Sequence, residues 1–431
     1  MAIETTFIII AAILFIGFLG ELIFERTNIP DVIWLLLIGI VMSLFFDVDA
    51  SAFSQAAPLF TTFALIFLLF EAGVNIDIKK FFKSAPQGLA LTVLSFFASF
   101  VIVFFLGLLI GLGMVLSLLL AAIVSGISSA VVLPVIRNMD VNQKVKLSMV
   151  IDSALSDVLC ILATVTIVEV VTRNTFSAAQ VTNSILSAFL IAITVGLVCG
   201  YVWSLILIKW LKARGTFHIL TLACMMVVFS LTQILGANGA IAALVFGLVL
   251  GNSAKAADLL REKINLITKS GKEFYAEISF LIKTFFFVYL GLLIDFSQPL
   301  SFLWAFIILV GLYLARPFAV WVALDKKTPL SDVQLAEVLI PKGLAAAVLV
   351  QLPLQAKIPG AEKLVNIVLA VILLSIIAST ILVFLVQKGT YKGIYPFLYD
   401  KYSTLKKGST KLRKKDSAKE RVNGRGKKQP E

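Results

Sequence analysis

Charged residues and histidine are scarce in this sequence of 431 residues. Lys, Arg, Asp and Glu together make up 14% of the chain, and His218 is the single histidine. Soluble domains average about a quarter charged residues, so the composition argues against a soluble globular protein. One histidine leaves no histidine pair for a catalytic metal, and the sequence has no glycine-rich phosphate-binding loop. We therefore expect no enzymatic activity and no cofactor.

Cysteine is rare as well, with three residues at Cys160, Cys199 and Cys224. All three fall within apolar segments, and their spacing matches neither a zinc site nor a disulfide framework. We expect them to be buried thiols that pack as small apolar side chains.

Apolar sequence is what the chain has in abundance. Hydrophobic residues make up 60% of it, and its mean hydropathy is +1.01. Many apolar runs reach the roughly 20 residues that a helix needs to cross the hydrocarbon of a bilayer. The alternating ten-residue segments of a transmembrane barrel are not found. The sequence predicts an all-α polytopic membrane protein with about 13 transmembrane helices. The predicted spans are 6–25, 30–46, 57–76, 86–112, 115–137, 146–171, 182–211, 217–235, 237–252, 274–295, 300–323, 333–352 and 362–387.

Basic residues concentrate in alternate loops. One set of loops and the carboxyl-terminal tail hold most of the Lys and Arg residues, whereas the opposite loops hold only Arg173, Lys357 and Lys363. The positive-inside rule then predicts a multi-pass protein of the cell membrane with its amino terminus outside and its carboxyl terminus in the cytoplasm. Residues 253–273 mix aliphatic and basic residues, which favours an interfacial helix on the cytoplasmic face.

The tail at 396–431 is predicted to be disordered. Residues 401–431 hold twelve Lys or Arg residues against three acidic ones. A basic segment beside a membrane anchor is attracted to anionic lipid headgroups. We therefore expect lipid, and not nucleic acid, as the partner of this tail.

Two spans contain breaks at corresponding positions. Span five contains SGISSAVVLP (125–134), and span twelve contains IPKGLAAAVLVQLP (340–353). The two are seven spans apart, and an odd displacement reverses the orientation across the bilayer. Broken helices in inverted-topology repeats are typical of secondary transporters, because the interrupted backbone exposes carbonyl groups and helix ends near the midplane. The alternative is two ordinary proline-kinked helices.

Span six carries two carboxylates, in DSALSDV (152–158). Asp157 and Ser153 share one helical face, as do Asp152 and Ser156, and the two carboxylates lie about 140° apart. A buried carboxylate is costly unless a proton or a cation neutralises it, and it cannot hold both at once. Sodium and lithium prefer oxygen ligands, which Asp157, Ser153 and the broken backbone of span five supply. The alternative is that both aspartates only bond neighbouring helices.

Two further charged residues within the spans are candidates for the site. Lys342 is in the middle of span twelve, directly after Pro341. An unpaired ammonium is costly there, so a carboxylate partner is expected. Asp152 is the predicted partner, with Glu337 as the alternative. Glu71 ends an apolar stretch of span three, either at an interfacial helix end or just inside the cytoplasmic mouth.

Four segments together resemble bacterial and archaeal sodium/proton antiporters of the monovalent cation:proton antiporter superfamily. The resemblance extends over essentially all of the predicted spans. The segments that carry it are LLFEAG (68–73), DSALSDV (152–158), FFFVYLGLLID (285–295) and PKGLAAAV (341–348).

The resemblance implies a homodimer that exchanges cytoplasmic sodium or lithium for protons. Within a transmembrane domain at 1–395, a six-helix core would carry the ion by an elevator-like motion against a dimerising scaffold. The core would comprise 86–171 and 300–387, and the scaffold 1–85 and 182–295.

The resemblance also implies roles for individual residues. Asp157 would bind cation and proton in competition, and Asp157 and Ser153 would be sodium ligands. Main-chain oxygens near Ile127 and Ser128 would complete the site. Glu71 would lie along the approach to the ion.

The sequence departs from the family pattern at three places. Ser156 stands beside the key aspartate, where the family usually has Asn or Asp. Asp152 and Lys342 stand where many members have Glu and Arg as a bracing pair. The stretch Ile127-Ser128-Ser129 replaces a Thr-Asp-Pro motif. Ser156 and Asp152 remain candidate site residues.

The missing second carboxylate bears on the choice between functions. With one carboxylate at the site, electroneutral one-for-one exchange is expected. Potassium/proton exchange is the alternative within the same class, since a weaker site charge would permit it. An ion channel or a sensor on the same scaffold is the alternative of another class, but a channel needs a continuous polar pathway, and the sequence offers one polar cluster per half. Organic-anion symport would need more cationic residues than Lys342 at the broken helices.

Overall fold

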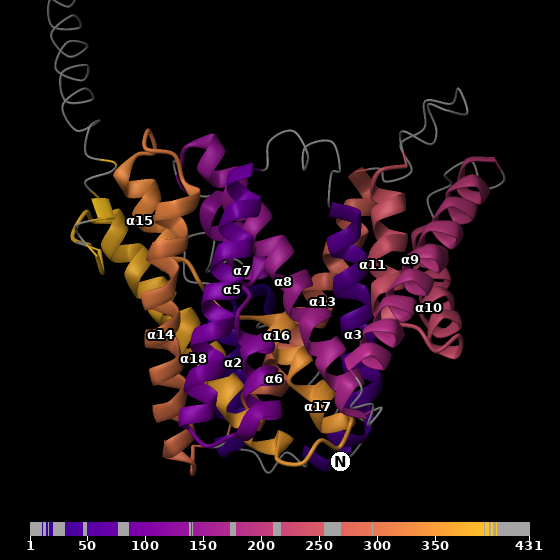
Figure 1. Cartoon of the computed structure of the whole chain (residues 1–431), viewed down its shortest axis with the longest axis horizontal. Helices are drawn as coiled ribbons and strands as arrows, with labels where there is room; N and C mark the ends of the chain where they lie inside the picture. Colours follow the sequence, from indigo (N-terminus) through magenta and orange to yellow (C-terminus); the bar gives the residue numbers. More distant parts are fainter. Residues whose placement is uncertain are drawn as a thin grey trace, which may run out of the picture.

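The described part of the chain is entirely helical, as Figure 1 shows. The computed structural model describes residues 11, 14, 15, 17–19, 31–45, 50–75, 86–137, 139, 141–172, 178–209, 217–253, 269–294, 296–391, 393–395, 398, 399 and 402. The helices are α2 (Asp31–Phe45), α3 (Ala50–Asn75), α5 (Pro86–Leu109), α6 (Gly113–Val124), α7 (Ser129–Arg137), α8 (Gln143–Thr172), α9 (Ala178–Lys209), α10 (Phe217–Ile234), α11 (Gly239–Gly251), α13 (Lys269–Leu293), α14 (Pro299–Ala323), α15 (Leu330–Val338), α16 (Leu344–Leu349), α17 (Gln351–Gln355) and α18 (Ala361–Gln387).

The predicted class, a polytopic helical membrane protein, is confirmed. Among the described residues, seven helices are long and apolar enough to cross a membrane: α5, α8, α9, α10, α13, α14 and α18. Shorter apolar helices accompany them in α2, α3, α6, α11 and α16–α17. Most of the span predicted at 6–25 lies outside the described residues, as do residues 254–268 of the predicted interfacial helix and nearly all of the tail.

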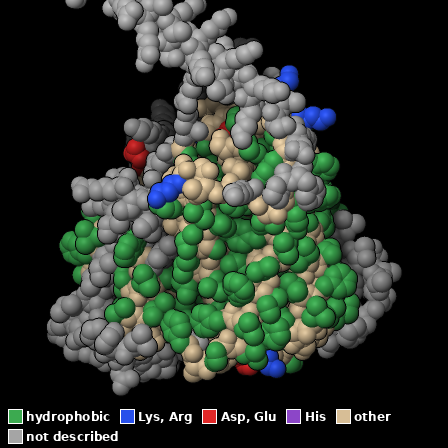
Figure 2. Space-filling model, turned by 90° about the vertical axis from the view of Figure 1, so that its left-hand side faces the viewer, with side chains coloured by type: hydrophobic (Ala, Val, Ile, Leu, Met, Phe, Trp, Pro, Cys, Tyr) green, Lys and Arg blue, Asp and Glu red, His purple; other side chains and the backbone are tan. Residues whose placement is uncertain are grey.

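The outer surface is apolar, as a lipid-facing surface must be. Figure 2 shows the face that carries α14, where apolar side chains fill a broad band between charged residues at its upper and lower rims. Along α14, Leu303, Phe306, Val310, Leu314 and Phe318 are all exposed. Soluble monomers rarely expose an apolar surface of this extent. The surface therefore supports a position within the bilayer.

Both predicted helix breaks are present. The first separates α6 from α7 at residues 125–128, and the second separates α15 from α16 at residues 339–343. In the first, the Ser125 hydroxyl donates to the Ala121 carbonyl at 2.6 Å, an interaction that competes with helix continuation. In the second, Pro341 lacks an N–H and disfavours helical backbone at the residue before it. These local effects end each half-helix inside the bundle.

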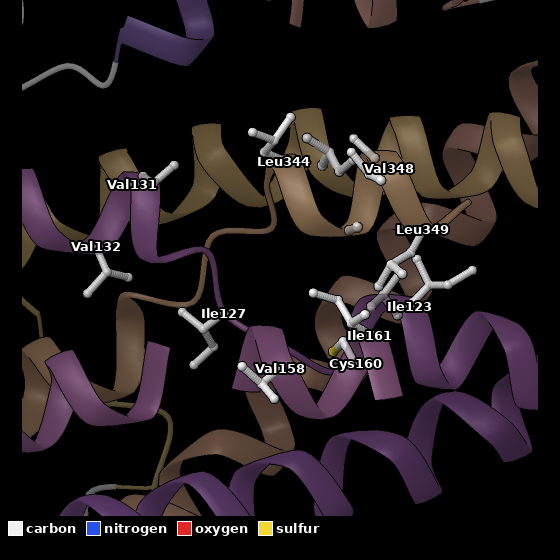
Figure 3. Packing of buried hydrophobic residues seen from close by; sticks show 14 of the residues in the cluster. Ile123, Ile127, Val131, Val132, Val158, Cys160, Ile161, Leu344, Val348 and Leu349 are labelled. Atoms are coloured by element: carbon white, nitrogen blue, oxygen red, sulfur yellow. The ribbon is translucent and has the colours of Figure 1, made fainter. Parts of the chain in front are cut away.

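The two breaks cross each other in van der Waals contact. The Ser128 N–H donates to the Pro341 carbonyl at 2.8 Å, which joins the two interrupted backbones directly. Gly343 permits this approach, because a Cβ atom there would overlap the Ser128 side chain. Buried apolar side chains, among them Ile127, Val158 and Leu344, surround the crossing (Figure 3).

Two helix groups and a separate pair of helices, α2 with α13, make up most of the packing. Helices α5, α6, α8, α14, α15 and α18 pack mainly on one another, and α3, α9, α10 and α11 form a second group. The second group is closely packed: Gly247 of α11 lies against the backbone of Phe70 in α3, where a Cβ atom would overlap the carbonyl oxygen. Small residues allow such contact between membrane helices. The first group corresponds in sequence to the predicted core.

Candidate functional site

Asp157 of α8 lies at the amino end of the half-helix α7. Its Oδ2 accepts hydrogen bonds from the Ser129 hydroxyl at 2.9 Å and from the Ser129 N–H at 3.3 Å. Ser129 is the first residue of α7, so this N–H has no partner within the helix. The positive end of a helix dipole favours an anion at this position. Asp157 remains partly exposed, and its hydrogen bonds to the described residues are made by Oδ2. Among those residues Oδ1 has no hydrogen-bond partner, so it can take another ligand.

Ser156 and Ser153 lie beside Asp157 on α8, and both are buried. The Ser156 hydroxyl accepts from the Ile127 N–H at 3.0 Å, and its own proton points to the Ser153 carbonyl at 3.2 Å or to the Ile127 carbonyl at 3.5 Å. Ser156 therefore holds the first break against α8. The Ser153 hydroxyl donates to the Val150 carbonyl at 3.2 Å, which leaves its oxygen lone pairs available.

The two main-chain oxygens predicted to face the ion differ in their partners. The Ser128 carbonyl accepts from the Val132 N–H at 3.0 Å and from the Val131 N–H at 3.3 Å, as the cap of α7. Among the described residues, the Ile127 carbonyl receives only the long contact from Ser156. Of the two, the Ile127 carbonyl is the one with more capacity for a cation.

Lys342 is buried at the second break and points to the first. Its side-chain Nζ donates to the Gly126 carbonyl at 2.6 Å, and its backbone N–H donates to the Ser375 hydroxyl at 2.9 Å. Gly126 follows the carboxyl end of α6, where the helix dipole favours a cation. The crossing thus places a positive side chain at the end of one half-helix and a negative side chain at the start of the next.

The predicted ion pair between Lys342 and Asp152 is wrong. Asp152 Oδ2 pairs with the Arg316 guanidinium at 2.7 Å, and both side chains are buried. The alternative partner of Lys342 was wrong too, because the Glu337 carboxylate accepts from the Tyr399 hydroxyl. The physical reason is geometric: a planar guanidinium can bind several acceptors at once, whereas an ammonium acts as a point charge that a carbonyl at a helix end can satisfy.

All three nitrogen atoms of the Arg316 guanidinium make polar contacts. Besides Asp152, it donates from NH1 to the Ser95 hydroxyl at 2.6 Å and from Nε to the Ala336 carbonyl at 2.9 Å. It thereby joins α14 to α5, α8 and α15. The prediction that Asp152 and Asp157 serve different partners is confirmed, since one faces α14 and the other faces α7.

Sequence reasoning missed Arg316 and did not assign a role to Ser129. Arg316 interrupts the apolar span 300–323, so the cost of burying a charge would have singled it out as it did Lys342. Ser129 could have been found as the first residue of the half-helix after the break, where a helix has N–H groups without partners inside the helix.

Glu71 lies apart from the crossing. It belongs to α3, and its carboxylate accepts a hydrogen bond from the Ser279 hydroxyl of α13. No contact among the described residues joins it to Asp157. Its proposed place along the ion's approach stays a prediction.

Comparison with known proteins assigns the chain to a family. Residues 10–388 match the family model described as "Sodium/hydrogen exchanger, transmembrane". The chain belongs to the sodium/hydrogen exchanger family. Curated relatives of this exchanger-family chain include the Na(+)/H(+) antiporter NhaS2 of Synechocystis sp., which is 27% identical over 394 residues, covering 88% of this chain and 69% of the relative.

Another similar protein is named for a different cation. The K(+)/H(+) antiporter NhaP2 of Shewanella baltica is 27% identical over 257 residues, covering 58% of this chain and 42% of the relative. The matched region of this exchanger-family chain thus spans about two fifths of the length of the first curated relatives.

Solved structures share the fold of this exchanger-family chain. The sodium proton antiporter MjNhaP1 from Methanocaldococcus jannaschii at pH 8 superimposes with a TM-score of 0.73 at 22% identity, covering 90% of this chain and 99% of the other. An electron-microscopy structure of MjNhaP1 gives a TM-score of 0.67 at 24% identity, covering 91% and 100%. At these identities the likeness establishes the fold alone.

Proposed function

We propose that the chain is a secondary transporter that exchanges cytoplasmic sodium or lithium for protons. This proposal depends on the geometry of Asp157, a partly exposed carboxylate inside the helix bundle. Ser129 binds its Oδ2, and Oδ1 has no hydrogen-bond partner among the described residues. Such a carboxylate needs a neutralising partner, and a proton or a small cation can serve. Because the two cannot bind together, release of one admits the other.

In this proposal each nearby group has a distinct part. The Asp157 Oδ1, the Ser153 hydroxyl and the Ile127 carbonyl bind the cation, with the Ser128 carbonyl beside them. Ser156 holds the broken backbone in place, and these hard oxygen ligands suit sodium or lithium. Ser129 holds the carboxylate in one orientation. Glu71 attracts cations on their way to the site.

We infer one-for-one, electroneutral exchange. Asp152 is committed to Arg316 at 2.7 Å, and Lys342 to the Gly126 carbonyl at 2.6 Å. If both contacts persist through the cycle, Asp157 is the one carboxylate at the crossing that trades partners. Each cycle then moves one cation against one proton.

The proposed motion is of elevator type. The helix group that contains the crossing would act as the moving core, and the group around α3, α9 and α11 as the scaffold of a homodimer. The basic loops and tail would lie in the cytoplasm, with the tail on anionic lipid. The apolar surface of α14 supports movement against lipid.

Transport in proteoliposomes tests the function. With an imposed pH gradient, sodium and lithium should collapse the gradient at low concentrations, and potassium should do so weakly. With valinomycin and potassium clamping the voltage, the sodium-driven rate should stay unchanged, because electroneutral exchange carries no current. An absence of cation-dependent proton movement would refute the proposal, and a rate that depends on voltage would refute the stoichiometry.

Potassium/proton exchange is a second candidate. The observation that favours it is the match to proteins named K(+)/H(+) antiporter NhaP2. The same cation scan decides between the two, since a response to potassium equal to that to sodium would favour this candidate. A conductance in planar bilayers without added proton gradient would instead favour a channel.

A cross-link between core and scaffold tests the motion. The Asn238 side chain at the start of α11 donates to the Glu169 carboxylate near the end of α8 at 3.3 Å. With the native cysteines replaced, Glu169→Cys and Asn238→Cys joined by a short thiol cross-linker should stop exchange, and cleavage should restore it. An elevator cannot move with its two parts joined.

A cross-link inside the core serves as the control. Gln298, which precedes α14, and Asn366 of α18 contact each other at 3.1 Å. Gln298→Cys joined to Asn366→Cys should leave exchange unchanged. If the first cross-link also leaves exchange unchanged, the elevator proposal fails.

A further inference from the structure

The last turn of the half-helix α15 is held at three consecutive residues. The Ala336 carbonyl accepts from Arg316 Nε at 2.9 Å, and the Val338 carbonyl accepts from the Tyr313 hydroxyl at 3.2 Å. Both donors belong to α14. Between them, the Glu337 carboxylate accepts from the Tyr399 hydroxyl, which lies beyond the end of α18.

Tyr399 is one of the residues described between 391 and 402, after α18, and several of these contact α15 or α14. Two more hydrogen bonds join this stretch to the bundle. The Tyr391 carbonyl accepts from the Gln334 side chain of α15 at 3.1 Å. The Tyr402 hydroxyl donates to the Trp321 carbonyl of α14 at 3.3 Å. Tyr399 and Tyr402 are both buried. We call the described residues of this stretch, namely 391, 393–395, 398, 399 and 402, the carboxyl-terminal strap.

The chemistry of this contact is that of a neutral phenol bound to a carboxyl group. Burial raises the pKa of Tyr399 above its ordinary value, and the hydrogen bond to Glu337 raises it further. The hydroxyl therefore keeps its proton and donates it.

The held turn leads directly into the crossing. Three to five residues after Glu337 come Ile340, Pro341 and Lys342, of which Pro341 accepts from Ser128 and Lys342 donates to Gly126. A displacement of the turn would therefore shift both contacts. Arg316, which binds Ala336 on the same turn, also holds Asp152 of the α8 helix that carries Asp157.

We propose that Tyr399 is a positioning residue for the cation site: the strap holds Glu337, Glu337 holds the last turn of α15, and that turn sets the crossing of the two breaks. This inference rests on the proposed function for its effect on transport, but not for its structural part. It connects described residues beyond the end of α18 mechanically to the ion site.

Tyr399→Phe tests the inference, because it removes one hydroxyl and preserves the ring. Two measurements on the full chain are needed. Hydrogen–deuterium exchange of residues 336–343 should become about three- to tenfold faster, the size expected from losing one such hydrogen bond. The half-saturating sodium concentration for exchange should rise by a similar factor, with the maximal rate within about twofold of the unaltered protein.

Matched variants separate positioning from general packing. Glu337→Gln keeps an acceptor oxygen and should behave as the unaltered protein, whereas Glu337→Leu should match Tyr399→Phe. The double variant Tyr399→Phe with Glu337→Leu should show hydrogen exchange and a half-saturating sodium concentration no higher than either single variant, as expected for two partners of one bond. Tyr201→Phe, an exposed tyrosine of α9, should change nothing.

The possible outcomes are decisive. Unchanged hydrogen exchange at residues 336–343 in Tyr399→Phe overturns the inference, whatever transport shows. Faster hydrogen exchange with an unchanged half-saturating sodium concentration also overturns it, since the turn would then not set the site. If the unaltered protein shows no exchange, the proposed function fails, and the hydrogen-exchange result still decides whether the strap holds the turn. Should Tyr399→Phe not fold, Glu337→Leu breaks the same bond from its other side.

Discussion

Asp157→Asn should abolish cation/proton exchange while the protein stays folded. Asn has the same shape as Asp, and its amide oxygen can still accept from the Ser129 hydroxyl and N–H that now bind Oδ2 at 2.9 and 3.3 Å. What it lacks is a charge for the cation to neutralise and a basic oxygen for the proton. Exchange in proteoliposomes should therefore fall to the rate of liposomes without protein, with the thermal unfolding midpoint close to that of the unaltered protein.

The same assignment predicts how pH affects the unaltered protein. If proton and sodium compete for one carboxylate, acidification should raise the half-saturating sodium concentration by up to about tenfold per pH unit, by mass action, with the maximal rate less affected. Separate sites for the two ions would give no such rise.

Glu362→Gln is the matched control for Asp157→Asn. Glu362 is an acidic residue exposed in the first turn of α18, outside both helix breaks. It should retain full exchange. Full exchange by Asp157→Asn would show that another group carries the ions, and the proposed site would then be abandoned.

Arg316→Ala should be the most destabilising of the single substitutions considered. The side chains of Arg316 and Asp152 are 3% and 2% exposed, and their 2.7 Å contact neutralises two charges inside the bundle. Removing the arginine leaves the Asp152 carboxylate unpaired, which typically costs about 3–5 kcal/mol. It also strips the Ser95 hydroxyl and the Ala336 carbonyl of their donor. The free energy of unfolding of the purified protein in detergent checks this expectation.

Two comparisons make the result specific. Lys342→Met removes a donor from a neutral carbonyl, so it should cost less, about 1–3 kcal/mol. Combining Arg316→Met with Asp152→Leu removes both charges and should recover much of the lost stability. A larger loss for Lys342→Met than for Arg316→Ala would contradict the assignment of Arg316 as the partner of Asp152.

Much of the candidate site could be predicted from the sequence, because the cost of burying polar groups marks it. Asp157 and Lys342 are ionisable residues inside apolar spans, and such residues are rare unless they function or pair. The breaks in spans five and twelve are marked by serine, glycine and proline, which act on their own local backbone. These features depend on residues near one another in the chain.

The choice of partners could not be predicted in this way. Asp152, Lys342 and Arg316 each need a partner, and the sequence alone does not say which pairs with which. Sequence reasoning joined Lys342 to Asp152, whereas the fold gives Asp152 to Arg316 and Lys342 to the end of α6. The bond between Tyr399 and Glu337 likewise joins segments that no local pattern relates.

The sequence by itself determined that this chain is a bundle of membrane helices, where its helices break, and which aspartate faces the first break. Composition and periodicity suffice for these, because the bilayer penalises each exposed polar group wherever it lies in the chain. The tertiary structure alone decided how the buried charges are compensated and that Ser129 orients Asp157. Those outcomes depend on which side chains the packing of distant helices brings within hydrogen-bonding distance. Among these neighbours, the planar guanidinium of arginine and the compact ammonium of lysine then favour different acceptors.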